Sequence, residues 1–429
     1  LSIHESRHVS QMQFGMTQAM KPFNWIFGEM FNILTAVFYP GMATMEGDAV
    51  IMETAYSNSG RGRIADFLNY YRVAFDEGVE RSWYKWRYGS KRFYTPNYYA
   101  LGYITIGGIR TLYDCPDFMY RMYELAARRP YDLGAYYTTI KNVTGKKLKP
   151  VFKEISDSLK VEWKAEADAR APYIPFDALT KTSKIYTDYT QSISTPDGLF
   201  TVKSGYLNTP VLIKIDLDSG KEKFVHNISA NISNLQLDEN NSRIWWSEST
   251  RSSRWSLKSK SILYRMDTGS GKVKSFRNRE LLHNPAPSPE GELVAVAQYN
   301  VNGTTGVTIL ESEGGQWREG HQAPDSLQIV ELAWKEQNNI YCSAISDGGY
   351  GIYMLDRRLD RWKMILQPRP VMITNLNCTD KGLSFTSDLD GENELYNLDL
   401  QNNTLIRKSR SRFGLSDYAD IPEAGLAVF

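Results

Sequence analysis

The sequence predicts a multidomain protein in which a mostly helical first part precedes an all-β second part. Two patterns support this division: helical periodicity dominates up to about residue 170, and short apolar runs separated by turns dominate from Ile185 onward. The length is a third observation, because 429 residues exceed what one hydrophobic core usually holds. We therefore expect a helical domain at 1–170, a linker at 171–184 and a β domain at 185–429.

Composition limits the classes of partner. Hydrophobic residues make up 42% of the chain and charged residues 23%, values typical of a globular protein. Fifty basic and 49 acidic side chains leave a net charge of +1, so we expect no general attraction to nucleic acid. The three cysteines contain no C-x-x-C spacing and predict neither a disulfide framework nor a thiolate metal site.

The first part of the chain carries a series of helical patterns. We expect helices at about 4–20, 45–54, 64–77, 81–88, 98–113, 116–128 and 148–169. The apolar segment 23–45 is interrupted by Asn24, Glu29 and Pro40, so we interpret it as a buried or interfacial helical hairpin and not as a transmembrane span. A role at a membrane surface stays open as an alternative for this hairpin.

The first helix contains the pattern His4-Glu5-x-x-His8. Residues four apart lie on one face of a helix, so the two imidazoles can bind one metal ion while Glu5 lies beside it. The chain has only five histidines, which makes this pattern more informative than a short motif usually is. The alternative is a histidine pair that is merely solvated or hydrogen-bonded.

A hydrolytic zinc site needs three protein ligands and an open position for water. Segment 45–54 predicts an apolar helix with Glu46 and Glu53 about two turns apart on one face. We predict that Glu46 is the third ligand and that Glu53 accepts a hydrogen bond from the far ring nitrogen of His4 or His8. Ordinary surface charge is the alternative for both carboxylates.

The loop after this helix places Arg61 and Arg63 among glycines. Glycine permits unusual backbone angles, so the two guanidinium groups are held close together. We interpret the segment as a solvated turn, with the binding of a substrate carboxylate as the alternative.

Turn-and-strand units repeat through the second part at a nearly constant interval. Turns that precede an apolar strand recur near positions 198, 240, 291, 338, 382 and 425, so the intervals run from 42 to 51 residues. A period of about 40 to 45 residues with four short strands is typical of a β-propeller blade. We predict five complete blades, a sixth that begins near Ser416 and is cut off at Phe429, and an insertion at 249–261 that explains the longest interval.

The histidine motif, together with the later Glu46-Gly47-x-Ala49 and Glu53, resembles the gluzincins, the zinc-metallopeptidase clan that includes thermolysin and aminopeptidase N. The resemblance covers about 1–165 and is closest to the aminopeptidase N branch. It implies bound Zn²⁺, catalysis by Glu5 and an oxyanion donor at Tyr99, which lies in a Tyr-x-x-Gly pattern. Tyr98 and Tyr103 are the alternatives for that donor.

This sequence departs from the gluzincin pattern at two points. The spacing between His8 and Glu46 is longer, because segment 23–45 is inserted, and Met42-Ala43-Thr44-Met45 replaces the bulky residue usual before the third ligand. In gluzincins a β-sheet precedes the motif helix, and no such sheet is in this sequence. We therefore expect the chain to be a fragment of a longer bacterial protein with an incomplete propeller.

A peptidase-like domain followed by a propeller looks like secreted or periplasmic bacterial proteins with a TolB-type propeller. That resemblance implies a periplasmic, secreted or cell-surface location. The expected function is zinc-dependent hydrolysis of peptide bonds in peptide or protein substrates, with the propeller as a gating or docking module.

The alternative function belongs to another class. In it the propeller carries the function by binding a protein partner, and the metal domain is structural or inactive. A propeller hydrolase with its own Ser-His-Asp site is disfavoured, because His226, His283 and His321 are isolated and no G-x-S-x-G pattern occurs.

Overall fold

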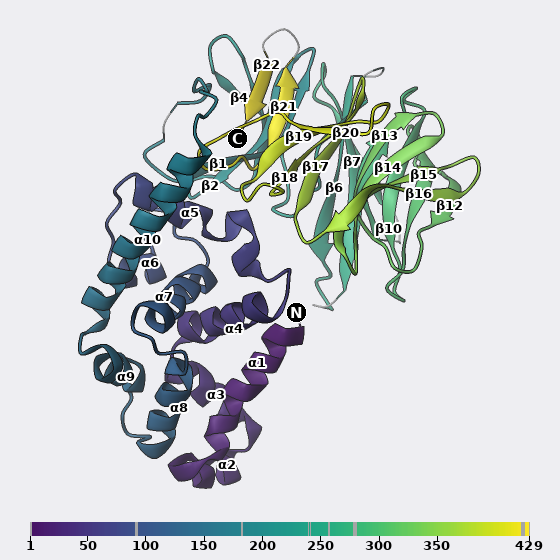
Figure 1. The fold of residues 1–429 in the computed structure, drawn as a ribbon. Helices are drawn as coiled ribbons and strands as arrows, with labels where there is room; N and C mark the ends of the chain where they lie inside the picture. Colours follow the sequence, from purple (N-terminus) through teal and green to yellow (C-terminus); the bar gives the residue numbers. More distant parts are fainter. Residues whose placement is uncertain are drawn as a thin grey trace. The chain divides into compact units, whose positions relative to one another are not determined.

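The chain divides into two compact units, Leu1–Pro172 and Tyr173–Phe429 (Figure 1). The computed structural model describes residues 2–90, 93–181, 183–238, 240, 242–255, 258–277, 281–421 and 425–428. In these residues the first unit is helical and the second consists of β-strands, so the predicted multidomain architecture is present.

The first unit contains ten α-helices and three short 3₁₀ segments in its described residues. The α-helices are α1 (Ser2–Met12), α2 (Lys21–Phe27), α3 (Glu29–Phe38), α4 (Met42–Tyr56), α5 (Ala65–Asp76), α6 (Trp83–Tyr88), α7 (Tyr98–Leu112), α8 (Phe118–Arg128), α9 (Ala135–Thr144) and α10 (Leu148–Arg170). The 3₁₀ segments are η1 (Gln13–Met16), η2 (Gln18–Met20) and η3 (Arg61–Arg63). Helix α9 was not predicted, because two of its four buried residues, Ala135 and Thr139, add little to a hydrophobic pattern.

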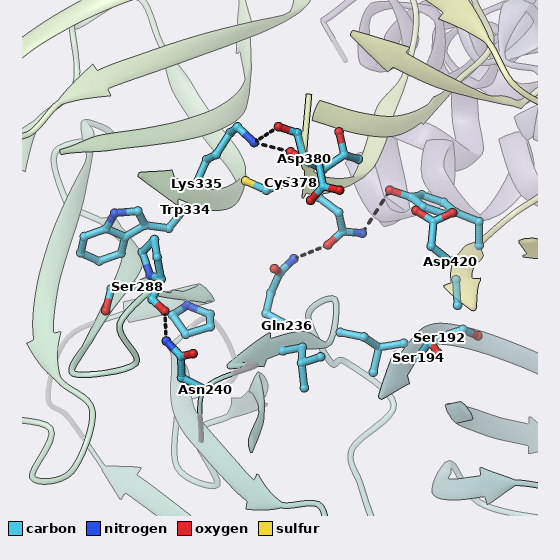
Figure 2. A pocket seen from close by; sticks show the side chains of 18 residues that line it. Ser192, Ser194, Gln236, Asn240, Ser288, Trp334, Lys335, Cys378, Asp380 and Asp420 are labelled. Atoms are coloured by element: carbon cyan, nitrogen blue, oxygen red, sulfur yellow. Dashed lines mark hydrogen bonds between the residues drawn. The ribbon is translucent and has the colours of Figure 1, made fainter. Parts of the chain in front are cut away.

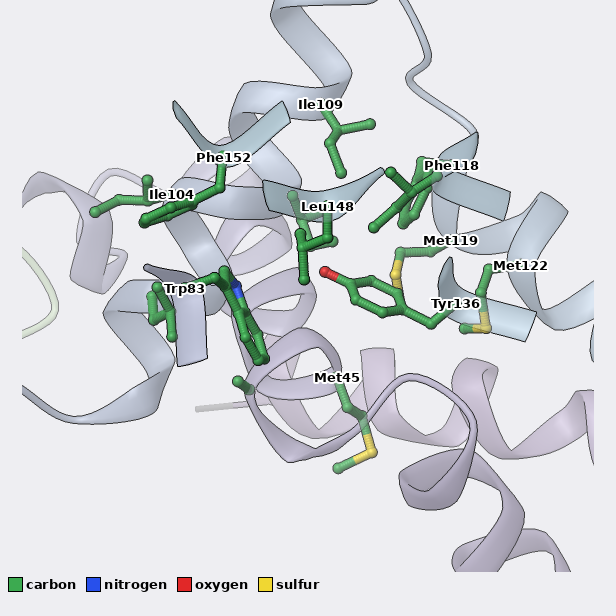
Figure 3. Close-up of a cluster of buried hydrophobic side chains, with 14 of the residues drawn as sticks. Met45, Trp83, Ile104, Ile109, Phe118, Met119, Met122, Tyr136, Leu148 and Phe152 are labelled. Atoms are coloured by element: carbon green, nitrogen blue, oxygen red, sulfur yellow. The ribbon is translucent and has the colours of Figure 1, made fainter. Parts of the chain in front are cut away.

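Most of these helices meet in one hydrophobic core (Figure 3). Trp83 from α6, Tyr136 from α9 and Leu148 from α10 lie together there, which shows how the unpredicted helix is held. The indole Nε1 of Trp83 donates to Thr105 Oγ1 at 3.0 Å, so this large ring brings no unpaired donor into the core.

Helices α4 and α7 cross with their backbones in direct contact at Gly47 and Gly102. A Cβ on Gly102 would lie 1.7 Å from Ala43 O, and one on Gly47 would lie 2.1 Å from the carbonyl carbon of Gly102. Only glycine fits at either position. This contact fixes the first turn of α7 against the part of α4 that carries the predicted metal ligand.

Segment 21–38 forms two short helices, α2 and α3, joined at Gly28, whose φ of +67° suits glycine. The predicted hairpin is present, and of its two expected settings, buried or interfacial, the exposure of its outer side chains excludes the buried one. Trp25 is 88% exposed and Ile26 is 64% exposed. Among the described residues, no helix is long and apolar enough to cross a bilayer.

The strands of the second unit form five antiparallel four-stranded sheets and one two-stranded sheet within the described residues. The first two sheets contain β1 (Thr187–Thr195), β2 (Gly198–Gly205), β3 (Val211–Ile215) and β4 (Glu222–Asn227), then β5 (Gln236–Asp238), β6 (Arg243–Arg251), β7 (Ser259–Asp267) and β8 (Val273–Arg277). The third contains β9 (Leu281–Pro287), β10 (Leu293–Tyr299), β11 (Thr305–Glu311) and β12 (Trp317–Gln322).

The fourth sheet contains β13 (Gln328–Glu336), β14 (Asn339–Ser346), β15 (Gly349–Asp356) and β16 (Arg361–Arg369). The fifth contains β17 (Ile373–Thr379), β18 (Gly382–Ser387), β19 (Glu394–Asp399) and β20 (Thr404–Arg407). In every sheet the strands pair in chain order, which is the pattern of a propeller blade. The second unit is therefore a β-propeller with five complete blades in the described residues.

The two-stranded sheet joins the fifth blade to the first. It consists of β21 (Tyr418–Ile421) and β22 (Gly425–Val428), at the place of the predicted sixth blade, and Phe429 lies outside the described residues. Tyr418 OH lies 2.6 Å from Ser384 Oγ on β18, and Ser192 N on β1 donates to Asp417 Oδ2 at 2.5 Å. These two contacts link the ends of the ring.

Two predicted connecting segments have defined partners. In segment 249–261, residues 249–251 of β6 pair with residues 259–261 of β7 at the far end of that hairpin, and residues 256 and 257 lie outside the described residues. Ile174, in the predicted linker, donates its backbone N–H to Arg410 O at 2.9 Å within the second unit.

Candidate metal centre and propeller cavity

Helix α1 presents His4 and His8 from buried positions one turn apart. Glu46 of α4 is buried as well and lies against both imidazoles. Glu5, between the two histidines in sequence, is exposed. The structure thus brings together the three side chains predicted as metal ligands and leaves the predicted catalytic carboxylate open to solvent.

The three ligand atoms form a nearly equilateral triangle. His4 Nε2 lies 3.1 Å from both Glu46 Oε2 and His8 Nε2, and His8 Nε2 lies 3.2 Å from Glu46 Oε2. A tetrahedral zinc ion with bonds of about 2.0 to 2.1 Å holds its ligand atoms about 3.3 Å apart. The donor types and their spacing therefore fit zinc.

We call these three side chains, His4, His8 and Glu46, the metal triangle. In the part of the chain that the structure describes, it is the one group of three or more histidine, cysteine or carboxylate side chains whose ligand atoms lie within 4.8 Å of one another. The candidate metal centre is therefore confined to the α1–α4 contact.

A glutamine determines the tautomer of His8. Gln11 donates from its Nε2 to Met45 O at 3.0 Å and to Asp48 Oδ2 at 2.8 Å, which leaves its Oε1 facing His8 Nδ1 at 2.8 Å. Because an amide oxygen only accepts, Nδ1 carries the hydrogen of neutral His8. The lone pair of Nε2 then points into the metal triangle, as a metal ligand requires.

Asp48 anchors Gln11 and is itself fully buried. Its Oδ2 accepts from Arg7 Nε at 2.7 Å and its Oδ1 from Arg110 Nη2 at 2.5 Å. Two guanidinium groups thus compensate a carboxylate that would be costly to bury alone. The sequence analysis did not predict the roles of Gln11 and Asp48. Two signals could have indicated them: a glutamine about one turn after His8, and an acidic residue inside an apolar helix.

His4 has two competing partners at its other ring nitrogen. His4 Nδ1 lies 3.1 Å from Glu53 Oε2 and 2.7 Å from Arg61 Nη2. A protonated Nδ1 donates to Glu53, whereas an unprotonated Nδ1 accepts from Arg61. Glu53, the partner that the sequence predicts, is therefore within reach of His4, and the position of the hydrogen decides between it and Arg61.

Arg61 belongs to the site, and its interpretation as part of a solvated turn is wrong. Its Nε donates to Glu53 Oε1 at 2.7 Å, its Nη2 donates to Glu53 Oε2 at 3.0 Å, and its backbone N–H donates to Oε1 at 3.0 Å. The Arg61 guanidinium is therefore held in a bidentate ion pair with Glu53. Arg63 turns away and donates to Thr54 O and Ser57 O near the end of α4.

Tyr99, in the first turn of α7, lies beside the metal triangle. Its ring stacks with His4 at 6.2 Å between centroids, and the Arg61 guanidinium carbon lies 4.8 Å from its ring centre. Burial and the neighbouring Glu46 carboxylate raise the pKa of Tyr99 to about 12. The phenol therefore keeps its proton at neutral pH and can donate a hydrogen bond.

The two alternative tyrosines have other partners. The Arg87 guanidinium carbon lies 4.6 Å from the ring centre of Tyr98, and Tyr103 packs edge-on against Phe67 with 5.6 Å between centroids. Tyr99 is the tyrosine of the three whose ring stacks on His4.

The charges around the metal triangle are coupled. The hydrogen bond to Glu46 raises the pKa of His8 above its usual 6.5. Burial by itself raises the pKa of Glu46, but hydrogen bonds and charge from His8 and His4 outweigh burial and lower that pKa. Burial also opposes ionisation of Glu53, and Arg61 outweighs it, so the pKa of Glu53 is lowered. Both carboxylates are ionised at neutral pH, as a cation site requires.

The second unit holds a cavity of about 380 Å³ where the first strands of its blades converge (Figure 2). Each sheet contributes to the lining, with Ser192, Gln236, Pro287, Trp334, Asn377 and Tyr418. Gln236 Nε2 donates to Asn377 Oδ1 at 3.1 Å, and Asn377 Nδ2 donates to Tyr418 OH at 3.2 Å, so the amides form one network across the cavity (Figure 2). The exposed carboxylates of Asp380 and Asp420 also line it.

Neither His283 nor His321 belongs to a Ser-His-Asp site within the described contacts. His283 Nδ1 lies 3.2 Å from Ser249 Oγ, and burial lowers the pKa of this histidine. His321 Nδ1 lies 2.8 Å from Asp360 Oδ1. One histidine thus has a serine and the other a carboxylate, so neither has both.

Comparison with known proteins shows little similarity in sequence. No family model matches the chain, and no curated protein matches it. Among solved structures, TolB from Acinetobacter baumannii is 14% identical with a TM-score of 0.38, over 52% of this chain and 53% of that one. The match therefore spans about half the length of the TolB chain.

Two peptidase structures match to the same degree. An acylaminoacyl peptidase from Pyrococcus horikoshii is 14% identical with a TM-score of 0.39, over 55% of this chain and 41% of that one. The β-propeller domain of the Trilobed protease from Pyrococcus furiosus is 10% identical with a TM-score of 0.38, over 55% of this chain and 88% of that one. Similarities this low carry no argument about function, and the propeller fold rests on the paired strands of this chain.

Proposed function

We propose that the protein is a zinc-dependent peptidase whose centre is His4, Glu5, His8 and Glu46. The observation that carries the proposal is the metal triangle, with edges of 3.1 to 3.2 Å between its ligand atoms. The resemblance of 1–165 to the gluzincins supports the same function and supplies the substrate class, a peptide bond. A zinc ion bound there would lower the pKa of a water molecule to about 7 and polarise the substrate carbonyl.

In this proposal Glu5 transfers the proton between the attacking water and the leaving amine. Glu5 is exposed on α1, between His4 and His8 in sequence, and after the larger effect of Glu46 its charge also raises the pKa of His8. From this position Glu5 takes a proton from the attacking water and delivers it to the leaving amine. General acid and base catalysis of this kind contributes about 10² to 10⁴-fold in rate.

In this proposal Tyr99 stabilises the oxyanion by donating a hydrogen bond to it. With a pKa of about 12 its phenol stays protonated, and it lies beside the Glu46 carboxylate. One such donor is worth about 2.7 to 4 kcal/mol in the transition state. Gln11 and Glu53 have a different task, since they orient His8 and His4 through the ring nitrogens that face away from the metal triangle.

Hydrolysis of a mixed peptide library tests the proposal, with zinc content measured on the same samples. Glu5→Gln is expected to keep one zinc per chain and to lose about 10² to 10⁴-fold in turnover. Tyr99→Phe is expected to lose about 10² to 10³-fold. Tyr98→Phe, one residue away, is the matched control and should retain turnover. If zinc-loaded wild type and Glu5→Gln hydrolyse the library at the same rate, the proposal is wrong.

We also infer that the substrates are met in the periplasm or outside a bacterial cell, and that the propeller gates or docks them. This part of the proposal depends on the resemblance to secreted proteins that pair a peptidase-like domain with a TolB-type propeller. Cell fractionation of the source bacterium with an antibody against the propeller tests the location.

A second candidate function is favoured by the propeller cavity. Its volume of about 380 Å³ lies within the range of ordinary ligand sites, and amides, carboxylates and Lys335 line it. In this alternative the propeller binds a polar segment of a protein partner, and the metal centre is structural. Asn377→Ala would then abolish partner binding while Glu5→Gln would leave it unchanged.

A further inference from the structure

The hairpin of α2 and α3 exposes an unusual number of large apolar side chains. Eight of them are between 41% and 88% exposed, and together they form the hairpin patch: Phe23, Trp25, Ile26, Phe27, Met30, Ile33, Leu34 and Phe38. At roughly 200 Å² for each side chain, the hairpin patch exposes on the order of 1,000 Å². The largest apolar patch of a typical soluble monomer is about 300 to 600 Å². The size of the hairpin patch therefore indicates that another molecule or phase covers it.

The exposed side chains of α2 cover more than half of its circumference, and Asn24 marks the covered side. Consecutive residues of a helix point about 100° apart. Trp25, Ile26 and Phe27 are consecutive, and they are 88%, 64% and 63% exposed. No residue of α2 is buried. A folded partner or a second copy of the chain would cover one narrow side of this helix, whereas a fluid apolar phase can cover the whole exposed arc.

The uncharged polar side chains of the hairpin, Asn24, Asn32 and Thr35, are covered and hydrogen-bonded, whereas Lys21 and Glu29 are exposed. Asn24 Nδ2 donates to Asn32 Oδ1 at 2.8 Å, and Asn32 is buried. Thr35 Oγ1 donates to Phe31 O at 2.8 Å, and the backbone N–H of Gly28 at the turn donates to Asn24 O at 2.7 Å. Satisfied polar groups are what the apolar part of a bilayer requires of any element that enters it.

Length and charge identify the mode of contact. At about 1.5 Å per residue, α2 and α3 are about 10 and 15 Å long, too short for a hydrocarbon core of about 30 Å. Both fit the outer 5 to 10 Å, where amphipathic anchors lie. Lys21 and Glu29 are the only charged residues of segment 21–38, so the hairpin has no net charge with which to attract anionic lipid. In Figure 1 the hairpin lies at one end of the helical unit.

We propose that the hairpin patch is a monotopic membrane anchor that inserts into the interface of a phospholipid bilayer without crossing it. Insertion is driven by apolar contact and does not depend on lipid charge. The anchor holds the first unit at a membrane surface whatever reaction the metal triangle performs, so this proposal is independent of the proposed peptidase activity.

Flotation of the whole 429-residue chain with neutral phosphatidylcholine vesicles tests the anchor. The wild type is expected to float with the vesicles, equally well at 0.1 and 0.5 M salt and with or without added anionic lipid. The double variant Ile26→Ser/Phe27→Ser is expected to reduce the bound fraction at least tenfold. Both side chains are exposed, so the variant should fold, and circular dichroism checks this. Trp317→Ser, a substitution of a 65% exposed tryptophan on β12, is the matched control and should float like the wild type.

Depth is measured with lipids brominated on the acyl chains. They are expected to quench part of the tryptophan fluorescence of the wild type, and that part should be missing in Trp25→Phe, which still floats. Failure of the wild type to float overturns the proposal. So does binding that requires anionic lipid and is lost at 0.5 M salt, and so does a hairpin-dependent dimer in solution that does not bind vesicles, because a second copy would then be the occupant.

Discussion

His4 Nε2 and His8 Nε2 lie 3.1 Å apart, the separation of two nitrogens that share one cation. Two protonated nitrogens would repel at this distance, and Gln11 keeps the Nε2 of neutral His8 unprotonated. The arrangement depends on the packing of α1 and α7 against α4, which carries Glu46. Each prediction below alters one part of it or of the propeller ring.

The first prediction concerns the crossing of α4 and α7. Gly102→Ala places a Cβ 1.7 Å from Ala43 O, so the helices must separate. We expect a loss of about 1 to 3 kcal/mol in the free energy of unfolding, or more, together with weaker zinc binding. Urea unfolding followed by circular dichroism measures the stability.

Gly107→Ala, on the same helix, is the control. Its Cβ would have Ile51 Cδ1 as nearest neighbour at 4.0 Å, which is ordinary contact. We expect this variant to be unchanged or more stable by about 0.5 to 1 kcal/mol, because alanine favours a helix over glycine. Equal losses in both variants would contradict the role of the crossing.

The second prediction concerns the orientation of His8. Gln11→Ala removes the oxygen that accepts from His8 Nδ1. Substitution of such a partner lowers metal affinity by about 10 to 100-fold, and we expect a loss in that range. Competition with a chelator measures the affinity. Gln13→Ala, at an exposed neighbouring position, should bind zinc like the wild type.

The third prediction concerns pH: protonation of His8 stabilises the metal-free fold, whereas it weakens the binding of zinc. The pKa of His8 is raised above 6.5 by Glu46, so His8 stabilises the metal-free fold below that value. This contribution is lost as the pH rises through the raised pKa. The pKa of Glu46 is lowered, so its contribution is present above 4.5 and is lost as the pH falls through the lowered pKa.

Zinc binding has the reverse dependence on His8, because only the neutral imidazole is a ligand. Zinc affinity is therefore expected to increase between pH 6 and pH 8, with release of a proton from His8 at the lower pH. Calorimetry in two buffers of different ionisation enthalpy counts the protons released. Equal affinity and no proton release at pH 6 would show that His8 is not a ligand.

The fourth prediction concerns the closure of the propeller ring. Burial raises the pKa of Asp417 to about 7, and its carboxylate accepts from Ser192 N. A carboxyl group with a raised pKa stabilises the fold in its protonated form, so the free energy of unfolding should fall as the pH rises from about 4 to 7. Asp417→Asn should reduce this slope, since its amide oxygen can still accept from Ser192.

Urea unfolding at pH 4.5 and pH 8 measures the slope. Burial also raises the pKa of Glu331 to about 7, so part of the slope should remain in Asp417→Asn and decrease further in the double variant with Glu331→Gln. Asp218→Asn, at an exposed position, is the control and should behave like the wild type. A slope that Asp417→Asn leaves unchanged contradicts the burial of this carboxyl group.

The repetition and periodicity of the sequence predicted the larger features. The interval of turns and strands predicted five complete blades, and the structure has five four-stranded sheets in its described residues. The histidine spacing and the later glutamates pointed to side chains that the structure brings together. Both predictions used patterns that can be read along the chain. The histidine pair and the glutamate pair each lie within one helix, and the turns and strands recur from one blade to the next.

Features that depend on contacts between distant segments were not predicted. Gln11 and Asp48 are ordinary polar residues in sequence, and only the packing of α1, α4 and α7 gives them partners. Arg61 was interpreted as part of a solvated turn because nothing near it in sequence shows that the loop folds back onto Glu53. The sequence left open whether the α2–α3 hairpin is buried or interfacial, since an apolar run has the same sequence whether or not it is covered.

X-ray absorption at the zinc edge, on the 429-residue chain with one equivalent of zinc, tests the central claim most directly. The account predicts two imidazole nitrogens at about 2.0 to 2.1 Å and one carboxylate oxygen at about 2.0 to 2.2 Å from the metal. Glu46→Gln is expected to lose the oxygen ligand and most of the affinity. Zinc held without imidazole, zinc held unchanged in Glu46→Gln, or no stoichiometric binding would contradict the metal centre at His4, His8 and Glu46.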